Sequence, residues 1–204
     1  MRQAGRRIFR RLVGQSWYQA ATRVALFAAI RNEPDLEAVL NDCNERGARC
    51  AYPRVRGEGL QFSYVSSIDE LIPGAFGVPE PRQGGDGGEG DGDGHGDSVA
   101  IADLDLVLTP GLVFDVRGGR IGYGKGFYDR AFGQAAFGQA AFEQAADGPL
   151  RVAVCWDHQV LPSDQRAPTH SGDAPLDAIV TERRVVVCSD RLPPPSAADR
   201  RDPS

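Results

Sequence analysis

The stretch that decides the fold is residues 23–53, RVALFAAIRNEPDLEAVLNDCNERGARCAYP. It opens with a nearly continuous apolar run over residues 23–29, which is typical of a strand buried on both faces of a parallel sheet. Apolar residues then recur at helical spacing, at Leu36, Val39, Leu40 and Cys43. Gly47 closes that helix, and residues 49–53 form a second strand candidate. The order strand–helix–strand predicts one βαβ unit with parallel strands and a right-handed crossover.

Strands and helices continue to alternate on both sides of this unit. Further strands are predicted at residues 61–65, 103–109, 151–156, 177–181 and 184–188, and helices at residues 4–21 and 127–146. This alternation is typical of the α/β class and predicts one domain over residues 1–192. Between residues 73 and 81 the chain is rich in turn residues.

Two segments are expected to stay outside the packed domain. Residues 84–97 are almost entirely glycine and acidic residues, a composition that cannot bury apolar area. They predict a mobile loop inserted in the domain. Residues 193–204 are proline-rich and charged, which predicts a disordered tail.

The charge and the termini narrow the class of protein. A net charge of −5 argues against nucleic acid as the main partner, since phosphate binding favours a basic surface. A local basic cluster is nevertheless present near the start, at Arg6, Arg7, Arg10 and Arg11. No apolar run approaches the ~20 residues of a membrane helix, and no secretory signal opens the chain. We expect a cytoplasmic monomer without a membrane or nucleic-acid partner.

The cysteines do not indicate a metal site. Cys43, Cys50, Cys155 and Cys188 lie far apart and show neither CxxC nor Cys/His spacing. Each lies in or beside an apolar run, so we expect buried, reduced thiols.

The segment richest in chemistry is RIGYGKGFYDR, residues 120–130. Glycines at 122, 124 and 126 precede a predicted helix, where backbone N–H groups can approach an anion. Arg120 and Lys125 supply cations for phosphate, and Asp129 could hold a metal ion beside it. The spacing is neither a Walker A loop nor a dinucleotide fingerprint. The residues alone therefore leave two interpretations open, a phosphate cradle or a tight turn before a helix.

The longer segment DLDLVLTPGLVFDVRGGRIGYGKGFYDR, residues 103–130, resembles the signature of the 5-formyltetrahydrofolate cyclo-ligase family, also called 5,10-methenyltetrahydrofolate synthetase. Members show PGLAFD, a short turn and R-L-G-x-G-x-G-Y-Y-D-R, with Phe127 here replacing the first tyrosine. The resemblance runs in order from about residue 6 to residue 182. Its other segments are RVALFAAIRNEPD at 23–35, GAFGVPEP at 74–81, WDHQ at 156–159 and DAPLDAIVTE at 173–182.

This resemblance implies a single three-layer α/β/α domain with a mostly parallel central sheet. It also implies ATP- and Mg²⁺-dependent cyclisation of 5-formyltetrahydrofolate to 5,10-methenyltetrahydrofolate, with release of ADP and phosphate. The implied partners are the small molecules ATP, as co-substrate, and 5-formyltetrahydrofolate.

The family's functional residues can be transferred to matching positions. The resemblance implies that ATP is bound by Arg120, Ile121, Gly122, Tyr123, Gly124, Lys125, Gly126, Phe127 and Tyr128. It implies that the folate is bound by Glu33 together with Gly122, Tyr123, Gly124, Lys125 and Gly126. Catalytic roles fall to Arg120, Lys125 and Tyr128, and Mg²⁺ to Asp129 and Asp173.

Simpler interpretations stand beside these roles. Glu33 before Pro34 could be an acid at the start of a helix, and Asp173 could cap a turn. Asp115 fits the family motif, yet turn formation alone would explain it. His158 and His170 match no family position and are expected to be structural or solvated.

The start of the chain departs from the family pattern. Members begin with a helix carrying K-x-x-x-R that reaches the ATP phosphates, whereas residues 4–27 here resemble the family's second helix and first strand. Arg6 and Arg10 have the same interval but align with a different helix. Two expectations follow: an active cyclo-ligase, or a catalytically impaired folate- or nucleotide-binding member that lacks this phosphate clamp.

Overall fold

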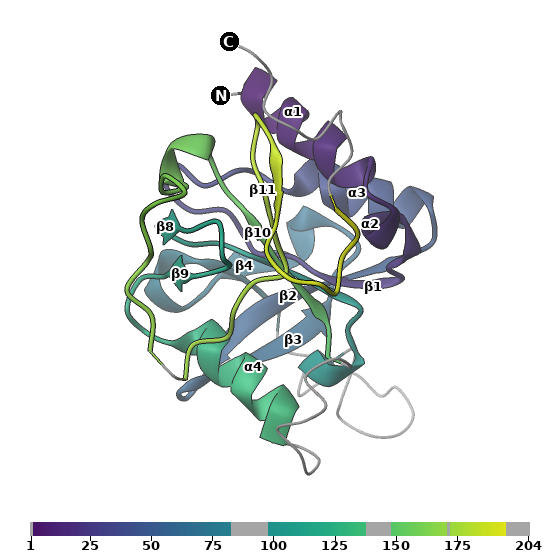
Figure 1. Cartoon of the computed structure of the whole chain (residues 1–204). Coiled ribbons are helices and arrows are strands. Elements are labelled where there is room, and N and C mark those ends of the chain that lie inside the picture. Colours follow the sequence, from purple (N-terminus) through teal and green to yellow (C-terminus); the bar gives the residue numbers. More distant parts are fainter. Residues whose placement is uncertain (1, 83–97, 138–147, 171, 195–204) are drawn as a thin grey trace, which may run out of the picture.

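The computed structural model describes residues 2–82, 98–137, 148–170 and 172–194. Its main sheet contains β1 (Arg23–Ala25), β2 (Arg49–Arg56), β3 (Gly59–Tyr64), β6 (Ser98–Val99), β7 (Leu106–Thr109), β10 (Leu150–Val154), β11 (Ala178–Val180) and β12 (Val185–Val187). The eight strands follow the order β12-β11-β10-β7-β1-β2-β3-β6 (Figure 1).

The centre of this sheet is parallel and its edges are antiparallel. Strands β11, β10, β7, β1 and β2 run parallel, while β12, β3 and β6 join antiparallel at the two edges. The predicted βαβ unit is confirmed, since β1 pairs in parallel with β2 through Val24 and Cys50. The strand β1 ends sooner than predicted, although Leu26, Phe27 and Ala28 after it are still buried.

Both faces of the central strands are buried, which explains their continuous apolar sequence. Along β7, Leu106 and Leu108 pack into the core cluster on one face, and Val107 packs into a cluster on the other. Along β10, Val152 and Ala153 are divided between the two faces in the same way. Side chains alternate because successive residues of a strand point to opposite sides.

Helices complete the expected three layers. The helices α1 (Arg2–Val13), α2 (Ser16–Ala20) and α3 (Glu37–Glu45) cover one face, and α4 (Phe127–Phe137) covers the other (Figure 1). The single helix predicted over residues 4–21 is wrong, because the chain leaves the helix at Gly14, a poor helix former. There the side-chain amide of Gln15 donates to the carbonyl of Arg11, satisfying a helix-end acceptor.

Two small hairpins stand outside the main sheet. The turn-rich segment near residue 73 pairs β4 (Leu71–Pro73) with β5 (Pro79–Pro81), and the glycine motif contributes β8 (Val113–Phe114) and β9 (Arg120–Ile121). Short 3-10 turns occur at Ile68–Glu70, Ala75–Gly77, Ile101–Asp103 and Asp157–Gln159.

Several sequence predictions fall outside the described residues. These are the loop at 84–97, the last part of the helix predicted over 127–146, and residues 195–204 of the predicted tail. Of the cysteines, Cys43, Cys50 and Cys155 are buried free thiols as predicted, whereas Cys188 is half-buried. No helix within the described ranges is long and apolar enough to cross a bilayer.

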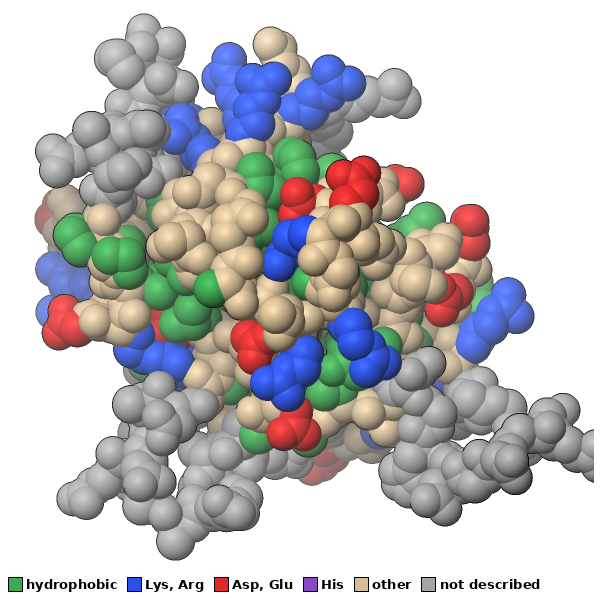
Figure 2. All heavy atoms as spheres, turned by 90° about the vertical axis from the view of Figure 1, so that its right-hand side faces the viewer, with side chains coloured by type: hydrophobic (Ala, Val, Ile, Leu, Met, Phe, Trp, Pro, Cys, Tyr) green, Lys and Arg blue, Asp and Glu red, His purple; other side chains and the backbone are tan. Residues whose placement is uncertain are grey.

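The predicted basic cluster lies on the outer side of α1. Arg6, Arg7 and Arg10 are exposed, whereas Ile8 and Leu12 on the same helix are buried against the sheet. Figure 2 shows basic side chains gathered at the top of the molecule, where Figure 1 places α1.

Candidate active site

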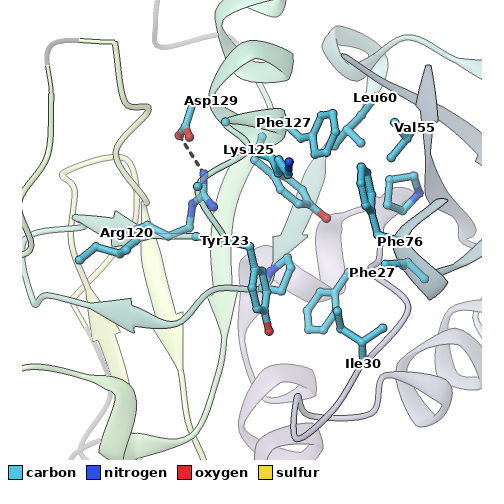
Figure 3. Close-up of a pocket in the computed structure, with 18 of the residues that line it drawn as sticks. Phe27, Ile30, Val55, Leu60, Phe76, Arg120, Tyr123, Lys125, Phe127 and Asp129 are labelled. Atoms are coloured by element: carbon cyan, nitrogen blue, oxygen red, sulfur yellow. Dashed lines mark hydrogen bonds and ion pairs between the residues drawn. The ribbon is translucent and has the colours of Figure 1, made fainter. Parts of the chain in front are cut away.

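One cavity of about 720 Å³ brings the predicted site residues together. It opens beyond the carboxyl ends of β1 and β7, which is where open α/β sheets bind ligands. Figure 3 shows its polar and apolar walls facing each other. Every residue assigned to ATP, folate or Mg²⁺ lines this cavity: Glu33, Arg120, Ile121, Gly122, Tyr123, Gly124, Lys125, Gly126, Phe127, Tyr128, Asp129 and Asp173.

The turn before the glycine motif is held by Asp115. Its carboxylate is buried and accepts three backbone N–H groups, from Arg117 at 2.8 Å, Gly119 at 3.1 Å and Ala167 at 2.8 Å. Burial opposes ionisation, but these donors outweigh it and lower the pKa of Asp115. Asp115 therefore fixes the turn between β8 and β9, which accords with the simpler of its two interpretations.

The glycine loop is preformed by two left-handed residues. Gly124 has φ +78° and Gly126 has φ +62°, backbone conformations that a residue with a Cβ adopts only at a cost in free energy. Arg130 on the first turn of α4 holds the loop, since its Nη2 donates to the carbonyl of Lys125 at 2.7 Å. Its Nε donates to the carbonyl of Glu58, which ties the loop to the β2–β3 turn.

Arg120 lies beneath this loop with a guanidinium that is only partly paired. Its side chain is 5% exposed, and Nη2 lies 2.8 Å from Oδ1 of Asp129. Its Nε is one of the buried side-chain nitrogens that have no hydrogen-bond partner within the described structure. A Cβ on Gly122 would lie 3.0 Å from Nη1, so this glycine leaves room for Arg120. A buried guanidinium that lines a cavity is suited to an anionic ligand.

Glu33 points into the cavity from the loop after β1. It accepts a hydrogen bond from the backbone N–H of Ile30 at 2.9 Å and from the Tyr123 hydroxyl at 3.1 Å. Burial raises the pKa of Glu33. Glu33 does not cap α3, which begins at Glu37, where Asp35 accepts from the backbone N–H of Glu37. The helix-start interpretation of Glu33 is therefore wrong.

Tyr128 and Lys125 differ in their surroundings. Burial raises the pKa of Tyr128, so its phenol is neutral at physiological pH, and Arg120 lies 5.5 Å from the ring centroid. Lys125 is exposed at the mouth of the cavity, with Nζ 5.5 Å from the ring centroid of Phe76. A mobile ammonium at the mouth and a fixed guanidinium below it can neutralise an anion from two sides.

Asp173 has a local structural role as well as a place in the cavity. Its Oδ2 accepts the backbone N–H of His170 at 2.8 Å, and its own N–H donates to the carbonyl of His170. This is the turn that the simpler interpretation predicted. His170 itself is exposed, as is His158, so both fit the expectation of solvated histidines.

Sequence reasoning missed the apolar half of the cavity. That wall contains Phe27, Ile30, Val55, Leu60, Phe76 and Val78. Phe27 and Ile30 belong to the apolar run that predicted a buried strand, and the run continues past the end of β1 to line the ligand space instead. The remaining residues come from β2, β3 and the β4–β5 hairpin, whose approach is a tertiary event.

A second pocket of about 480 Å³ adjoins the first. Arg31, Glu33 and Tyr123 line both pockets. The segment at residues 156–159 contributes Trp156, His158 and Gln159 to the second pocket. Ala4 is the residue that α1 contributes, and Arg6 and Arg10 are not among the residues that line either pocket in the described structure.

Comparison with known proteins agrees with this geometry. The profile of the 5-formyltetrahydrofolate cyclo-ligase family matches residues 1–182. The chain belongs to this family. Cyclo-ligase relatives include 5-formyltetrahydrofolate cyclo-ligase of Mus musculus, 25% identical over 84% of this chain and 79% of that protein. A probable 5-formyltetrahydrofolate cyclo-ligase of Caenorhabditis elegans is 22% identical over 88% of this chain and 82% of its own length.

Solved structures carry the same names. The solution structure of Aquifex aeolicus 5,10-methenyltetrahydrofolate synthetase matches with a TM-score of 0.71 and 28% identity, over 93% of this chain and 83% of that one. The corresponding Mycoplasma pneumoniae protein has a TM-score of 0.60 at 17% identity, over 88% of this chain and 85% of that one, and supports the fold. Membership of the cyclo-ligase family supports the conclusion that the chain is a ligase with 5-formyltetrahydrofolate cyclo-ligase activity.

Proposed function

We propose that this cyclo-ligase uses ATP to convert 5-formyltetrahydrofolate to 5,10-methenyltetrahydrofolate, releasing ADP and phosphate. The observation that carries the proposal is that the buried guanidinium of Arg120 and the exposed ammonium of Lys125 line one cavity beside a preformed glycine loop. A phosphate group is suited to two cations placed beside such a loop. Glu33 lines the same cavity, which supports binding of the second substrate next to the first.

The chemistry explains why a nucleotide is needed. The formyl oxygen on N5 is a poor leaving group, so it first attacks the γ-phosphorus of ATP and ADP departs. N10 then bonds to the activated formyl carbon, the C–O bond breaks with release of phosphate, and N10 loses its proton. The new C–N bond closes the methenyl ring.

The residues of the cavity act by positioning and by neutralising charge. Arg120 and Lys125 offset the negative charge of the phosphoryl group during transfer. The neutral phenol of Tyr128 can donate a hydrogen bond to a phosphate oxygen. Glu33 anchors the folate by accepting a hydrogen bond from a ring N–H, and the apolar wall excludes water from the activated formyl group.

Two carboxylates that line the cavity are the candidates for holding a magnesium ion. Within the described residues no group of three acidic, histidine or cysteine side chains surrounds one point. Mg²⁺ in nucleotide sites is commonly held by one or two carboxylates together with phosphate oxygens and water. Asp129 and Asp173 would supply those carboxylates, and the bound ion would neutralise charge on the nucleotide phosphates.

The direct test is an assay with 5-formyltetrahydrofolate, ATP and Mg²⁺ that follows methenyl-folate absorbance. We expect turnover that requires both ATP and Mg²⁺, with ADP and phosphate formed in equal amounts. Absorbance change without ATP would contradict the proposed mechanism. Binding of both ligands without turnover would instead favour the catalytically impaired alternative.

Location and assembly also belong to the proposal. We propose a monomer in the cytoplasm that acts on small molecules and binds neither nucleic acid nor membrane. One relative, from Arabidopsis thaliana, is named a mitochondrial enzyme. Cell fractionation and analytical ultracentrifugation test the two statements separately.

A further inference from the structure

Phe76 is an exposed apolar residue at the cavity, where the apolar wall meets Lys125. Its side chain is 71% exposed, the largest value among the exposed large hydrophobic residues of the described chain. It nevertheless lines the cavity, together with Phe27 and Phe127. Figure 3 shows Phe76 between Phe127 and Phe27, with Tyr123 beside Phe27.

The backbone presents this ring in an unfavourable conformation. Phe76 has φ +57°, in the left-handed region that phenylalanine rarely adopts. Among the described residues, Arg31 is the other non-glycine residue with a positive φ, and it also lines the cavity. Backbone strain of this kind persists where the surrounding structure enforces it, and such positions cluster at ligand sites.

The surrounding structure does enforce it, through Glu80. This carboxylate is buried, and its Oε1 accepts the backbone N–H of Ala75 at 3.1 Å and of Val55 at 3.3 Å. Its Oε2 lies 3.6 Å from Nε of Arg54. Gly74 allows this packing, because a Cβ there would lie 2.3 Å from the Glu80 side chain. Glu80 thus fixes the β4–β5 turn to β2, while the Phe76 side chain on that turn stays exposed.

The ring has contacts that orient it but do not bury it. Its centroid lies 6.3 Å from that of Phe127, with the rings inclined by 46°, and Nζ of Lys125 lies 5.5 Å from it. Lys125 belongs to the glycine loop and Phe127 begins α4, so the Phe76 ring meets this segment at the cavity mouth. An aromatic ring that is fixed in position but exposed to solvent, as Phe76 is, is suited to packing against a flat ring of a ligand.

We propose that Phe76 is a specificity-determining residue that packs its ring against the bicyclic ring system of the folate. This inference rests on the proposed function and adds a contact to the folate. The adjacent apolar residues Phe27 and Val55 extend the surface on which the bicyclic ring lies. The fixed turn presents the aromatic face before the substrate arrives, which reduces the ordering required on binding.

The test compares Phe76→Ala, Phe76→Leu and Phe76→Trp by calorimetric titration with 5-formyltetrahydrofolate and, separately, with ATP. We expect the folate Kd to rise about tenfold or more in Phe76→Ala, which corresponds to about 1.4 kcal/mol. The folate Kd of Phe76→Leu should lie between those of wild type and Phe76→Ala. The folate Kd of Phe76→Trp should stay near that of wild type, because tryptophan keeps an aromatic face. The ATP Kd should change less than about threefold, since ring packing concerns the folate.

Ile68→Ala is the matched control. Ile68 is also an exposed hydrophobic residue, at 37%, but it does not line either pocket. Its folate Kd should stay at the wild-type value. Because Phe76 is largely exposed, the melting temperature of Phe76→Ala should remain close to wild type, which separates loss of contact from loss of folding.

The outcomes distinguish this inference from the proposed function. A wild-type chain that binds and converts 5-formyltetrahydrofolate, with an unchanged folate Kd in Phe76→Ala, overturns the role of Phe76 alone. An equal loss of folate and ATP binding in Phe76→Ala also overturns it. A wild-type chain that does not bind 5-formyltetrahydrofolate overturns both.

Discussion

Arg120 and Asp129 form an ion pair across the base of the glycine loop, with Nη2 of Arg120 2.8 Å from Oδ1 of Asp129. Nine residues separate them in sequence, and the loop that they close contains most of the residues assigned to the nucleotide. The pair orients the guanidinium of Arg120, which lines the cavity and is buried. Asp129 is also one of the two carboxylates proposed to hold Mg²⁺. The Arg120–Asp129 ion pair therefore connects the shape of the glycine loop with the proposed metal site.

Asp129→Asn should abolish most turnover while leaving the chain folded. Asparagine keeps an acceptor for Arg120 but loses the charge, so we expect unfolding free energy to fall by about 1–2 kcal/mol. If Asp129 holds Mg²⁺, activity should recover in part at raised Mg²⁺ concentration. Assays across a Mg²⁺ series measure this, and recovery on raising folate alone would count against a metal role.

Glu33→Gln should weaken folate binding by about tenfold or more, because glutamine cannot supply a charged acceptor. Tyr123→Phe, which removes only the hydroxyl that bonds to Glu33, should have a smaller effect. Burial raises the pKa of Glu33, so its carboxylate is protonated at a higher pH than an exposed glutamate. The ratio of KM for folate between Glu33→Gln and wild type should therefore shrink as pH falls. A ratio that is constant with pH would show that the charge of Glu33 is irrelevant.

Gly126→Ala should reduce both stability and activity more than Gly124→Ala. Each substitution places a Cβ at positive φ, which costs about 1–2 kcal/mol. At Gly126 the Cβ would also lie 2.8 Å from Nη1 of Arg130, the side chain that holds the loop, whereas at Gly124 no atom lies within 4 Å. Thermal melts and ATP titrations of both variants measure the difference. Equal effects would mean that backbone strain alone matters.

Asp105→Asn should lower stability at neutral pH. Oδ2 of Asp105 accepts from the backbone N–H groups of Thr22 and Arg23, and Oδ1 lies 2.9 Å from Nη2 of Arg23. Burial opposes ionisation, but these contacts lower the pKa of Asp105 to about 2. A lowered pKa stabilises the fold above the ordinary carboxyl pKa and loses that contribution as pH falls toward 2.

The measurement for Asp105 is denaturant unfolding of both proteins between pH 7 and pH 3. We expect a difference of about 1 kcal/mol at pH 7, modest because this ion pair is partly exposed. Wild type should lose stability faster than the variant below pH 4. A difference that grows as pH falls would contradict the assignment.

Much of the fold was predictable because strand burial leaves a direct mark on sequence. Residues 23–29 and 103–109 read as buried strands, and the parallel pairing of β1 with β2 follows from the helix between them. Element ends were less predictable, since residues 26–28 are as apolar as β1 but lie beyond its end. The break at Gly14 was also missed, because apolar spacing continues across it.

The polar half of the site was predictable for a different reason. Residues 120–130 are contiguous, so a local motif carries the glycine loop, Arg120 and Asp129 together. The apolar half has no such motif. Phe76 and Val55 reach the cavity from a hairpin and a strand, and hydrophobic residues there have the same pattern whether they pack inside or face a ligand.

The sequence by itself determined the α/β class, the family and the set of charged residues that we assign to phosphate binding. Those properties depend on local periodicity and on a contiguous motif. Only the tertiary structure decided that Glu33 meets Tyr123 ninety positions away, that the guanidinium of Arg120 is buried against Asp129, and that Phe76 is held exposed by Glu80. These depend on distances between segments brought together by burial of the sheet, and burial is a property of the whole chain.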